Sequence, residues 1–472
     1  MPDANNDPAQ AGADSDDRSP QDRPDAPGFG QALAYWFKLG WISFGGPAGQ
    51  IAIMHEDVVK RRRWISEGRF LHALNYCMVL PGPEAQQLAT YIGWLLHGKR
   101  GGIAAGVLFV LPSLLILCTL SWVYLRWGEQ PMVSAVLDGV KPAVVAIVLA
   151  AAWRLGARAL RHRALWAIAV AALVAVAVFD VPFPAVILGA AVAGVITGRL
   201  WPSAIGGASH GPAHMDAAPR CVIDDADPPP PHAAFRLRRS FALVAVFVAI
   251  WAASIAILAA SRGVLGDTAL QLAWFHTKAA LLTFGGAYAV LPYVYQAAVE
   301  HYQWLSATQM IDGLALGETT PGPLIMVVAY VGFLAGWLRQ MLGPEALLAA
   351  GALGASIATL FTFLPSFLFI LAGGPFIEGT RQQIRLQAPL TGITAAVVGV
   401  IVNLAAFFAW HVLWPQGWIA GPSGAAALGG LDVLALGIGA AAAIALFRYR
   451  AGVIPVILAC GAAGLGARLA FG

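Results

Sequence analysis

Two stretches 240 residues apart decide the fold. Residues 38–47 have the sequence KLGWISFGGP, and residues 278–287 have the sequence KAALLTFGGA. Each places a lysine six residues before a Phe-Gly-Gly triplet, and each lies inside an apolar segment. Adjacent glycines weaken a helix because they lose the most backbone freedom on folding. The two stretches therefore predict two copies of one helix, broken at the same point.

Further motifs recur in the same order. The matching pairs are 81–83 with 321–323 (Pro-Gly-Pro), Trp64 with Trp304, 91–93 with 330–332 (Tyr-x-Gly), and 111–113 with 364–366 (Leu-Pro-Ser). Their offsets are 240, 240, 239 and 253 residues. A single shared glycine pair would carry no weight, but an ordered series at nearly one offset indicates an internal duplication.

The composition identifies the class of protein. Of 472 residues, 58% are hydrophobic and 11% are charged, whereas about a quarter of the residues of a soluble domain are charged. So few charges could not cover the surface of a soluble enzyme. The continuous apolar runs predict an all-α polytopic membrane protein with thirteen hydrophobic segments, whose partner is the lipid bilayer.

Charge and cysteine usage exclude other partners. The net charge of +4 is too small to predict nucleic-acid binding. The four cysteines form no C-x-x-C pair, so we predict no metal site and no cofactor. No paired catalytic His, Asp or Glu cluster is visible, and we expect no enzymatic activity.

The chain divides into four parts. Residues 1–28 are polar and predict a disordered tail, 29–200 form the first transporter repeat, and 201–239 form a Pro-rich cytoplasmic linker. Residues 240–472 hold an extra helix, at 241–261, and the second repeat. The extra segment makes the number of crossings between the two repeat starts odd. The second repeat is therefore expected in inverted topology, as in secondary transporters.

Arginine placement refines the topology. Cytoplasmic loops collect Lys and Arg, yet thirteen full crossings from a cytoplasmic N-terminus would put the basic loop 56–69 outside. The equivalent loop 297–309, which has no Lys or Arg, would lie inside. Both errors disappear if the segments carrying the Gly and Pro breaks are re-entrant hairpins. We therefore predict nine full spans and four hairpins.

The breaks predict an anion site. Lys38 and Lys278 are ionisable groups inside apolar segments, which makes them functional candidates. The alternative is that each side chain extends to the membrane interface. Ser43 and Thr283 offer hydroxyl donors at equivalent positions. Helix starts at the breaks expose free N–H groups that attract anions, although Pro and Gly can also merely kink packed helices. The predicted substrate-binding residues at the breaks are Gly45, Gly46, Pro47, Gly285, Gly286, Pro81, Gly82, Pro83, Pro321, Gly322 and Pro323.

Two carboxylates lie next to the Pro-Gly-Pro breaks. Glu84 follows the first break directly, and Glu318 precedes the second by three residues. A carboxylate repels an anionic substrate, so we predict that Glu84 and Glu318 carry protons instead. Asp138 and Lys141, three residues apart, are expected to form a structural ion pair. No ATP-binding motif is present, so active transport would be driven by a gradient or by the membrane potential.

The repeated FGG, Trp and PGP motifs resemble those of the chromate ion transporter family, in its long two-domain form. The resemblance covers about residues 30–470 and departs at Ala287, which stands where the first repeat has Pro47. It implies a bacterial cytoplasmic-membrane protein that exports chromate and confers chromate resistance, with sulfate as a competitor of the same shape and charge. The residues alone indicate only a small anion. An importer of sulfate or another oxyanion, and a membrane scaffold, remain alternatives, and the oligomeric state is open.

Overall fold

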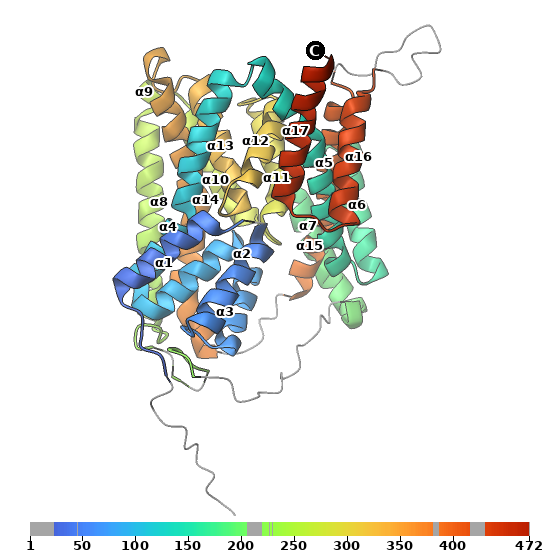
Figure 1. Cartoon of the computed structure of the whole chain (residues 1–472). Helices are drawn as coiled ribbons and strands as arrows, with labels where there is room; N and C mark the ends of the chain where they lie inside the picture. The colour runs from blue at the N-terminus through green and yellow to red at the C-terminus, as the bar shows by residue number, and fades with distance from the viewer. Residues whose placement is uncertain are drawn as a thin grey trace, which may run out of the picture.

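The computed structural model describes residues 23–44, 46–204, 220–225, 227–228, 230–380, 387–415 and 430–471. Within these ranges the fold is all-helical, and the only β-type pairing is an isolated bridge between Ile65 and Ile223 (Figure 1). Seven described helices are long and apolar enough to cross a membrane. The prediction of an all-α polytopic membrane protein is confirmed.

The first repeat contains seven α-helices and one π-helical turn. They are α1 (Phe29–Ile42), α2 (Gly46–Met54), the π-helix η2 (His55–Arg61), α3 (Glu67–Val79), α4 (Glu84–Trp127), α5 (Pro131–Ala159), α6 (Arg163–Phe179) and α7 (Phe183–Leu200).

The second half begins with the extra helix α8 (Leu237–Ala260), which has no buried residue, and the short α9 (Arg262–Leu265). The second repeat follows. It contains α10 (Thr268–Leu282), α11 (Ala287–Tyr295), the π-helix η4 (Gln296–His301), α12 (Ala307–Thr319), α13 (Val327–Leu338), α14 (Leu347–Thr380), α15 (Gln387–Leu413), α16 (Val433–Phe447) and α17 (Val453–Phe471).

The broken segments fold back on themselves. A span of the bilayer needs about 20 residues, but α1, α2 and α3 have 14, 9 and 13 residues. Contacts place the outer ends of these hairpins together: His97 Nε2 lies 2.9 Å from Pro27 O, and Arg339 donates to Tyr302 O in the other repeat. The predicted hairpins are therefore present in both repeats.

Helix α4 is two helices joined at a break. His97 and Gly98 leave helical geometry, and Gly98 has φ +63° and ψ −155°, a conformation that favours glycine. Residues 84–96 complete the second hairpin, and residues 99–127 run on as a long crossing helix. The predicted full spans correspond to the seven long helices together with the shorter apolar helices α6 and α16.

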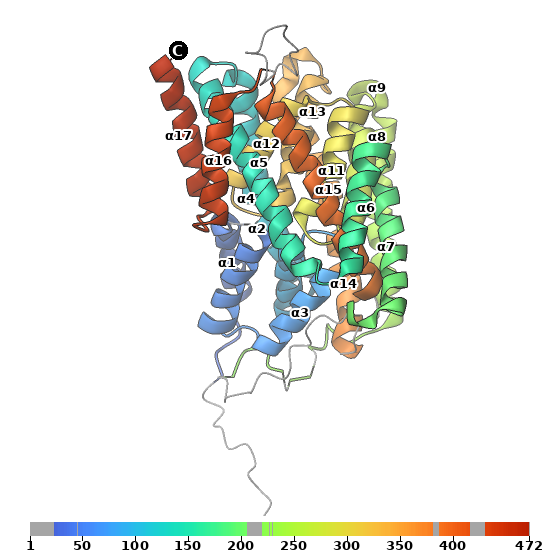
Figure 2. The same ribbon diagram turned by 90° about the vertical axis from the view of Figure 1, so that its right-hand side faces the viewer.

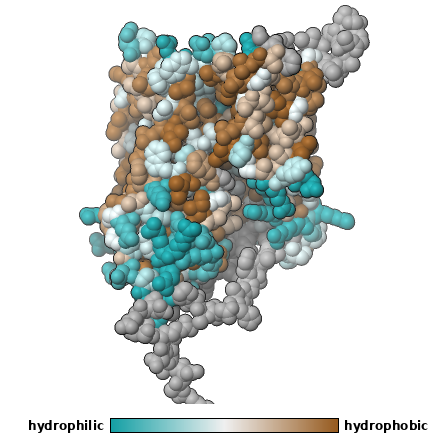
Figure 3. Space-filling view, viewed as in Figure 1, coloured by the Kyte–Doolittle hydropathy of each residue, from teal (hydrophilic) through white to brown (hydrophobic). Residues whose placement is uncertain are grey.

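The hairpins of the two repeats lie in opposite halves of the molecule. Figures 1 and 2 show α1, α2 and α3 in the lower half and α10 to α13 mostly in the upper half. Figure 3 shows apolar side chains over most of the upper part of this face, with hydrophilic ones at the lower end and along the upper rim. The inverted duplication predicted from the motifs is confirmed.

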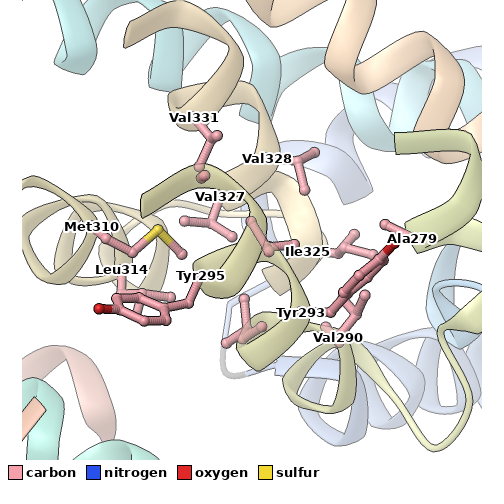
Figure 4. Packing of buried hydrophobic residues seen from close by; sticks show 14 of the residues in the cluster. Ala279, Val290, Tyr293, Tyr295, Met310, Leu314, Ile325, Val327, Val328 and Val331 are labelled. Atoms are coloured by element: carbon pink, nitrogen blue, oxygen red, sulfur yellow. The ribbon is translucent and has the colours of Figure 1, made fainter. Parts of the chain in front are cut away.

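The core is built around the two hairpins of the second repeat, which are formed by α10 to α13. Its largest cluster includes Val290 and Tyr293 of α11, Met310 and Leu314 of α12, and Val327 of α13. Figure 4 shows side chains from these elements packed against one another. Burying this apolar surface fixes the relative positions of the short helices, which are too short to be stable alone.

Glycines set the closest helix crossings. A Cβ at Gly194 of α7 would lie 2.4 Å from Ala388 O and 2.9 Å from Gly392 Cα of α15. The equivalent crossing joins Gly139 of α5 to Gly464 of α17, where the added Cβ would lie 2.8 Å from Gly464 Cα. Small residues let helix backbones approach closely in membranes, so both crossings depend on the absence of a side chain.

We expect Gly194→Val to lower the thermal unfolding midpoint of the purified protein. Overpacking costs about 1–3 kcal/mol, and the α7–α15 crossing leaves no room. Gly189→Val is the matched control, because a Cβ at Gly189 on the same helix meets nothing within 4 Å. Equal midpoints for the two variants would contradict this account of the α7–α15 contact.

Part of the predicted linker is packed. Val222 N–H donates to Arg63 O at 2.8 Å, Ser66 N–H donates to Ile223 O at 3.0 Å, and His232 Nε2 lies 2.8 Å from Trp94 O. These contacts hold the end of the linker against the hairpins of the first repeat. Residues 1–22, on which most of the predicted disordered tail falls, and residues 205–219 of the predicted linker lie outside the described residues.

Candidate functional site

The breaks of the two repeats are hydrogen-bonded to each other. Gly82 N–H, in the first Pro-Gly-Pro turn, donates to Thr283 O at 2.7 Å, beside the second Phe-Gly-Gly break. Gly322 N–H, in the second Pro-Gly-Pro turn, donates to Ser43 O, also at 2.7 Å. The two bonds join residues at the same repeat offset. Each repeat thus supplies a hydrogen-bond donor to the other repeat's break. We call these two paired breaks the crossing.

The Pro-Gly-Pro turns require glycine. Gly82 and Gly322 have φ +123° and +97°, values that L side chains rarely adopt. A Cβ at Gly322 would lie 1.8 Å from Ser113 Oγ, and one at Gly82 would lie 2.5 Å from Ser366 Oγ. The repeated Leu-Pro-Ser motif therefore has a structural role that the sequence did not reveal, because its serines close over the opposite repeat's turn.

Helices start at the crossing as predicted. Helix α4 begins at Glu84 and α11 at Ala287, and neither helix has a side-chain cap at its N-terminus. Helix α2 begins at Gly46, so Pro47 falls in the first turn, where its missing N–H costs no helical hydrogen bond. The change to Ala287 in the second repeat leaves the break intact. Gly45 lies outside the described residues.

Buried amides line the crossing. Gln50 donates to Gly322 O and lies 3.4 Å from Ser43 O, and Gln87 donates to Pro81 O at 2.8 Å. The Oε1 atoms of Gln50, Gln86 and Gln87, and Ser43 Oγ, are buried without a partner among the described residues. Gln50 was not singled out in the sequence. The signal was present: it is a lone amide in the apolar stretch after the first break.

The predicted hydroxyl pair behaves unequally. Ser43 and Thr283 are both fully buried. Thr283 Oγ1 donates to Ala279 O within α10, at 2.6 Å, whereas Ser43 Oγ remains unpaired. Of the two hydroxyls, only that of Ser43 is available as a donor in this conformation.

The two predicted proton carriers approach the same break. Glu318 Oε1 accepts a hydrogen bond from Tyr288 OH at 2.7 Å, in the first turn of α11. Glu84 Oε1 lies 3.9 Å from the position that a Cβ of Gly286 would occupy. One carboxylate comes from each repeat, and both are only partly exposed. The start of α11 is thus flanked by two acidic groups.

The lysine pair lies more peripherally. Lys38 is exposed on α1, on the same stripe as Phe37 and Trp41, and Lys278 is half-buried on α10. Neither ammonium group has a carboxylate within 4 Å among the described residues. Both side chains therefore keep an uncompensated charge, as an anion site needs, but their ammonium groups belong to no described contact at the crossing.

The two repeats differ in how tightly their hairpins are closed. Leu71 of α3 is 41% exposed, whereas its counterpart Ile311 of α12 is 1% exposed. Asn75 is exposed, and its counterpart Ala315 is buried. Helix α12 packs against α5, α13 and α17, while α3 packs chiefly against α4 and η2. One face of the molecule is thus closed over its hairpin and the other is not.

Polar contacts hold the closed face. Lys141 Nζ lies 2.8 Å from Asp138 Oδ1, the predicted pair, and 3.8 Å from Asp312 Oδ1. Tyr124 OH donates to Asp312 Oδ2 at 2.9 Å. Since Asp312 belongs to α12 and Lys141 to α5, this ion pair connects the second hairpin of the second repeat to the long helix α5.

A second buried ion pair lies near the linker. Arg69 Nη1 is 3.4 Å from Glu378 Oε2, and both side chains are only 6% exposed. Tyr91 OH also donates to Glu378, and Arg69 donates to the backbone carbonyl of Asp227 in the linker. Burial raises the pKa of Asp227, but the Asp224 N–H and the Arg23 guanidinium outweigh it and hold that pKa below its ordinary value. Asp227 thus stays ionised and pairs with Arg23.

Comparison with known proteins matches both repeats. The family model described as chromate transporter covers residues 30–195 and 270–465. A chromate transport protein of Pseudomonas aeruginosa is 33% identical over 92% of this chain and 91% of its own length. A chromate transport protein of Cupriavidus metallidurans is 29% identical over 79% of this chain and 80% of its own length. A probable chromate transport protein of Synechococcus elongatus is 28% identical over 79% of this chain and 82% of its own length. No solved structure matches the chain.

We expect Gly322→Ala to lower the unfolding midpoint much more than Gly343→Ala. Both glycines have positive φ, +97° and +84°, so both variants carry the same kind of backbone strain. Only Gly322 lies against Ser113, whereas a Cβ at Gly343 meets nothing within 4 Å. The difference should reach about 1–3 kcal/mol. Equal losses would mean that the crossing does not depend on this close approach.

Proposed function

Because the chain belongs to the chromate transporter family, we propose that it is a secondary transporter that exports chromate from the cytoplasm and so confers chromate resistance. Its place is the bacterial cytoplasmic membrane, with the N-terminus on the cytoplasmic side. The observation that carries the proposal is the crossing, where helix starts from both repeats meet beside unpaired buried polar atoms. Transporters use such helix starts to bind anions near the bilayer midplane.

The unequal closure of the two faces supports alternating access. The Lys141–Asp312 ion pair holds α12 against α5. The equivalent face of α3, which carries Leu71 and Asn75, is exposed. With the N-terminus in the cytoplasm, this is a conformation open toward the cytoplasm. Inverted repeats exchange their conformations during transport. The opposite state would close α3 and separate Lys141 from Asp312.

The membrane potential favours export. Moving a divalent anion out of a cell that is negative inside gains about 4–5 kcal/mol at roughly 100 mV, from about 2.3 kcal/mol per charge. Export can therefore run without ATP, driven by the potential or by the proton motive force. Sulfate has the same shape and charge and is the expected competitor. The second candidate is import of sulfate or another oxyanion, which would need coupling to several cations.

Chromate accumulation in everted membrane vesicles tests the proposed function. We expect accumulation in energised vesicles that exceeds that of vesicles lacking the protein, and inhibition by excess sulfate. Accumulation unaffected by collapse of the potential and the proton gradient would exclude energised export. Uptake of sulfate by energised right-side-out vesicles, without chromate accumulation in everted ones, would favour the importer.

Neutralising the lysine pair should reduce transport. We expect Lys38→Gln and Lys278→Gln each to lower the chromate accumulation rate at least tenfold, because each removes a positive charge from the path of a dianion. Lys60→Gln is the control, since Lys60 is an exposed residue of the basic loop that pairs with Glu56. Membrane content of each variant is measured in parallel. Full activity of the double variant would remove the lysines from the site.

The carboxylates should determine the pH dependence. If Glu84 or Glu318 carries a proton, Glu84→Gln or Glu318→Gln will flatten the dependence of the transport rate on pH at constant membrane potential. Tyr288→Phe removes the hydrogen bond to Glu318 without removing the carboxylate, and should shift the profile rather than flatten it. Unchanged profiles in both glutamine variants would exclude both residues from proton coupling.

A further inference from the structure

A basic cavity lies away from the crossing. It is shallow, with an enclosed volume of only about 10 Å³, and it lies between the break of α4, the end of the linker, the start of α8 and the last turns of α14. Its polar side is formed by Lys99, His232, Arg236 and Arg239. Helix α8 lies at the left edge of the molecule in Figure 1 and packs against α14.

The positive charge of this cavity is not neutralised. No Asp or Glu lines it. Arg239 donates to the carbonyl of His232 at 3.2 Å, and no ion pair joins Lys99, Arg236 or Arg239 to a carboxylate within the described part of the chain. Three cations held close together repel one another at a cost that a bound anion removes. The cavity is therefore suited to a negatively charged group.

The other side of the cavity is apolar and continues toward the lipid. Leu243, Leu371 and Pro375 form its inner wall. On the same helix as Leu243, Leu237 and Phe241 are 61% and 65% exposed, and α8 has no buried residue along its length. A free inorganic anion would leave this apolar surface uncovered. A ligand with a charged head and hydrocarbon chains would cover both sides.

We propose that this cavity binds an anionic phospholipid of the surrounding membrane. Lys99, Arg236 and Arg239 hold its phosphate at the open side of the cavity, and its acyl chains lie along α8 and the end of α14. Basic pockets between transmembrane helices recognise anionic headgroups in this way. His232 and Trp94 connect the cavity to the docked linker, since His232 Nε2 lies 2.8 Å from Trp94 O. The bound lipid thus fastens the junction between linker and extra helix to the first repeat.

The test is the thermal unfolding midpoint of the purified full chain in detergent, titrated with phosphatidylglycerol or phosphatidylcholine. The test variant is Lys99→Gln/Arg239→Gln. Its control is Arg100→Gln/Arg238→Gln, which removes equal charge from exposed neighbouring residues that do not line the cavity. Arg236→Gln provides a milder variant, because Arg236 is exposed and its loss leaves the Arg239–His232 bond in place.

We expect phosphatidylglycerol, but not phosphatidylcholine, to stabilise the wild type and the control. Half-maximal stabilisation of the test variant should need roughly thirtyfold more phosphatidylglycerol, since each of the two cations removed adds about 1 kcal/mol near the surface. Equal weakening in test and control variants would overturn the site. Equal stabilisation by glycerol phosphate, which has the head without the chains, would make it a soluble-anion site. Because transport is not measured, failure here would leave the proposed function untouched.

Discussion

The backbone hydrogen bonds from Gly82 to Thr283 and from Gly322 to Ser43 hold the two repeats together at their breaks. A broken helix leaves peptide groups without intrahelical partners, and inside a membrane each unsatisfied group costs several kcal/mol. Here each repeat supplies the missing partners of the other. This reciprocal arrangement explains why the breaks recur at one offset. It also places polar backbone and buried amides at the centre of an otherwise apolar protein.

The symmetry of the crossing contrasts with the asymmetry around it. The same hairpin is closed in the second repeat, through Asp312 and Lys141, and open in the first, where Leu71 is exposed. A duplicated sequence can adopt two arrangements because its repeats meet different neighbours. A symmetric centre with unequal sides is suited to a transporter, in which a fixed site is exposed to each side in turn.

Contacts outside the crossing attach the linker and helix α8 to the rest of the protein. The docked linker reaches the buried Arg69–Glu378 pair through Asp227, and His232 reaches the wall of the basic cavity. Both contacts lie on the face of the first repeat, whose hairpin is less well packed by its own helices. The linker and the extra helix α8 thus hold this face together without closing the hairpin.

The sequence by itself determined the membrane class, the duplication, its inversion and the hairpins, because hydropathy, motif order and arginine placement can be read along the chain without knowing how it packs. It also identified the Pro-Gly-Pro and Phe-Gly-Gly breaks. Only the tertiary structure decided which break meets which, because Gly82 and Thr283 are about two hundred residues apart. The same holds for Gln50, for the serines that close over the turns and for the peripheral position of Lys38. Such pairings depend on how the helices pack in space, and no local pattern records them.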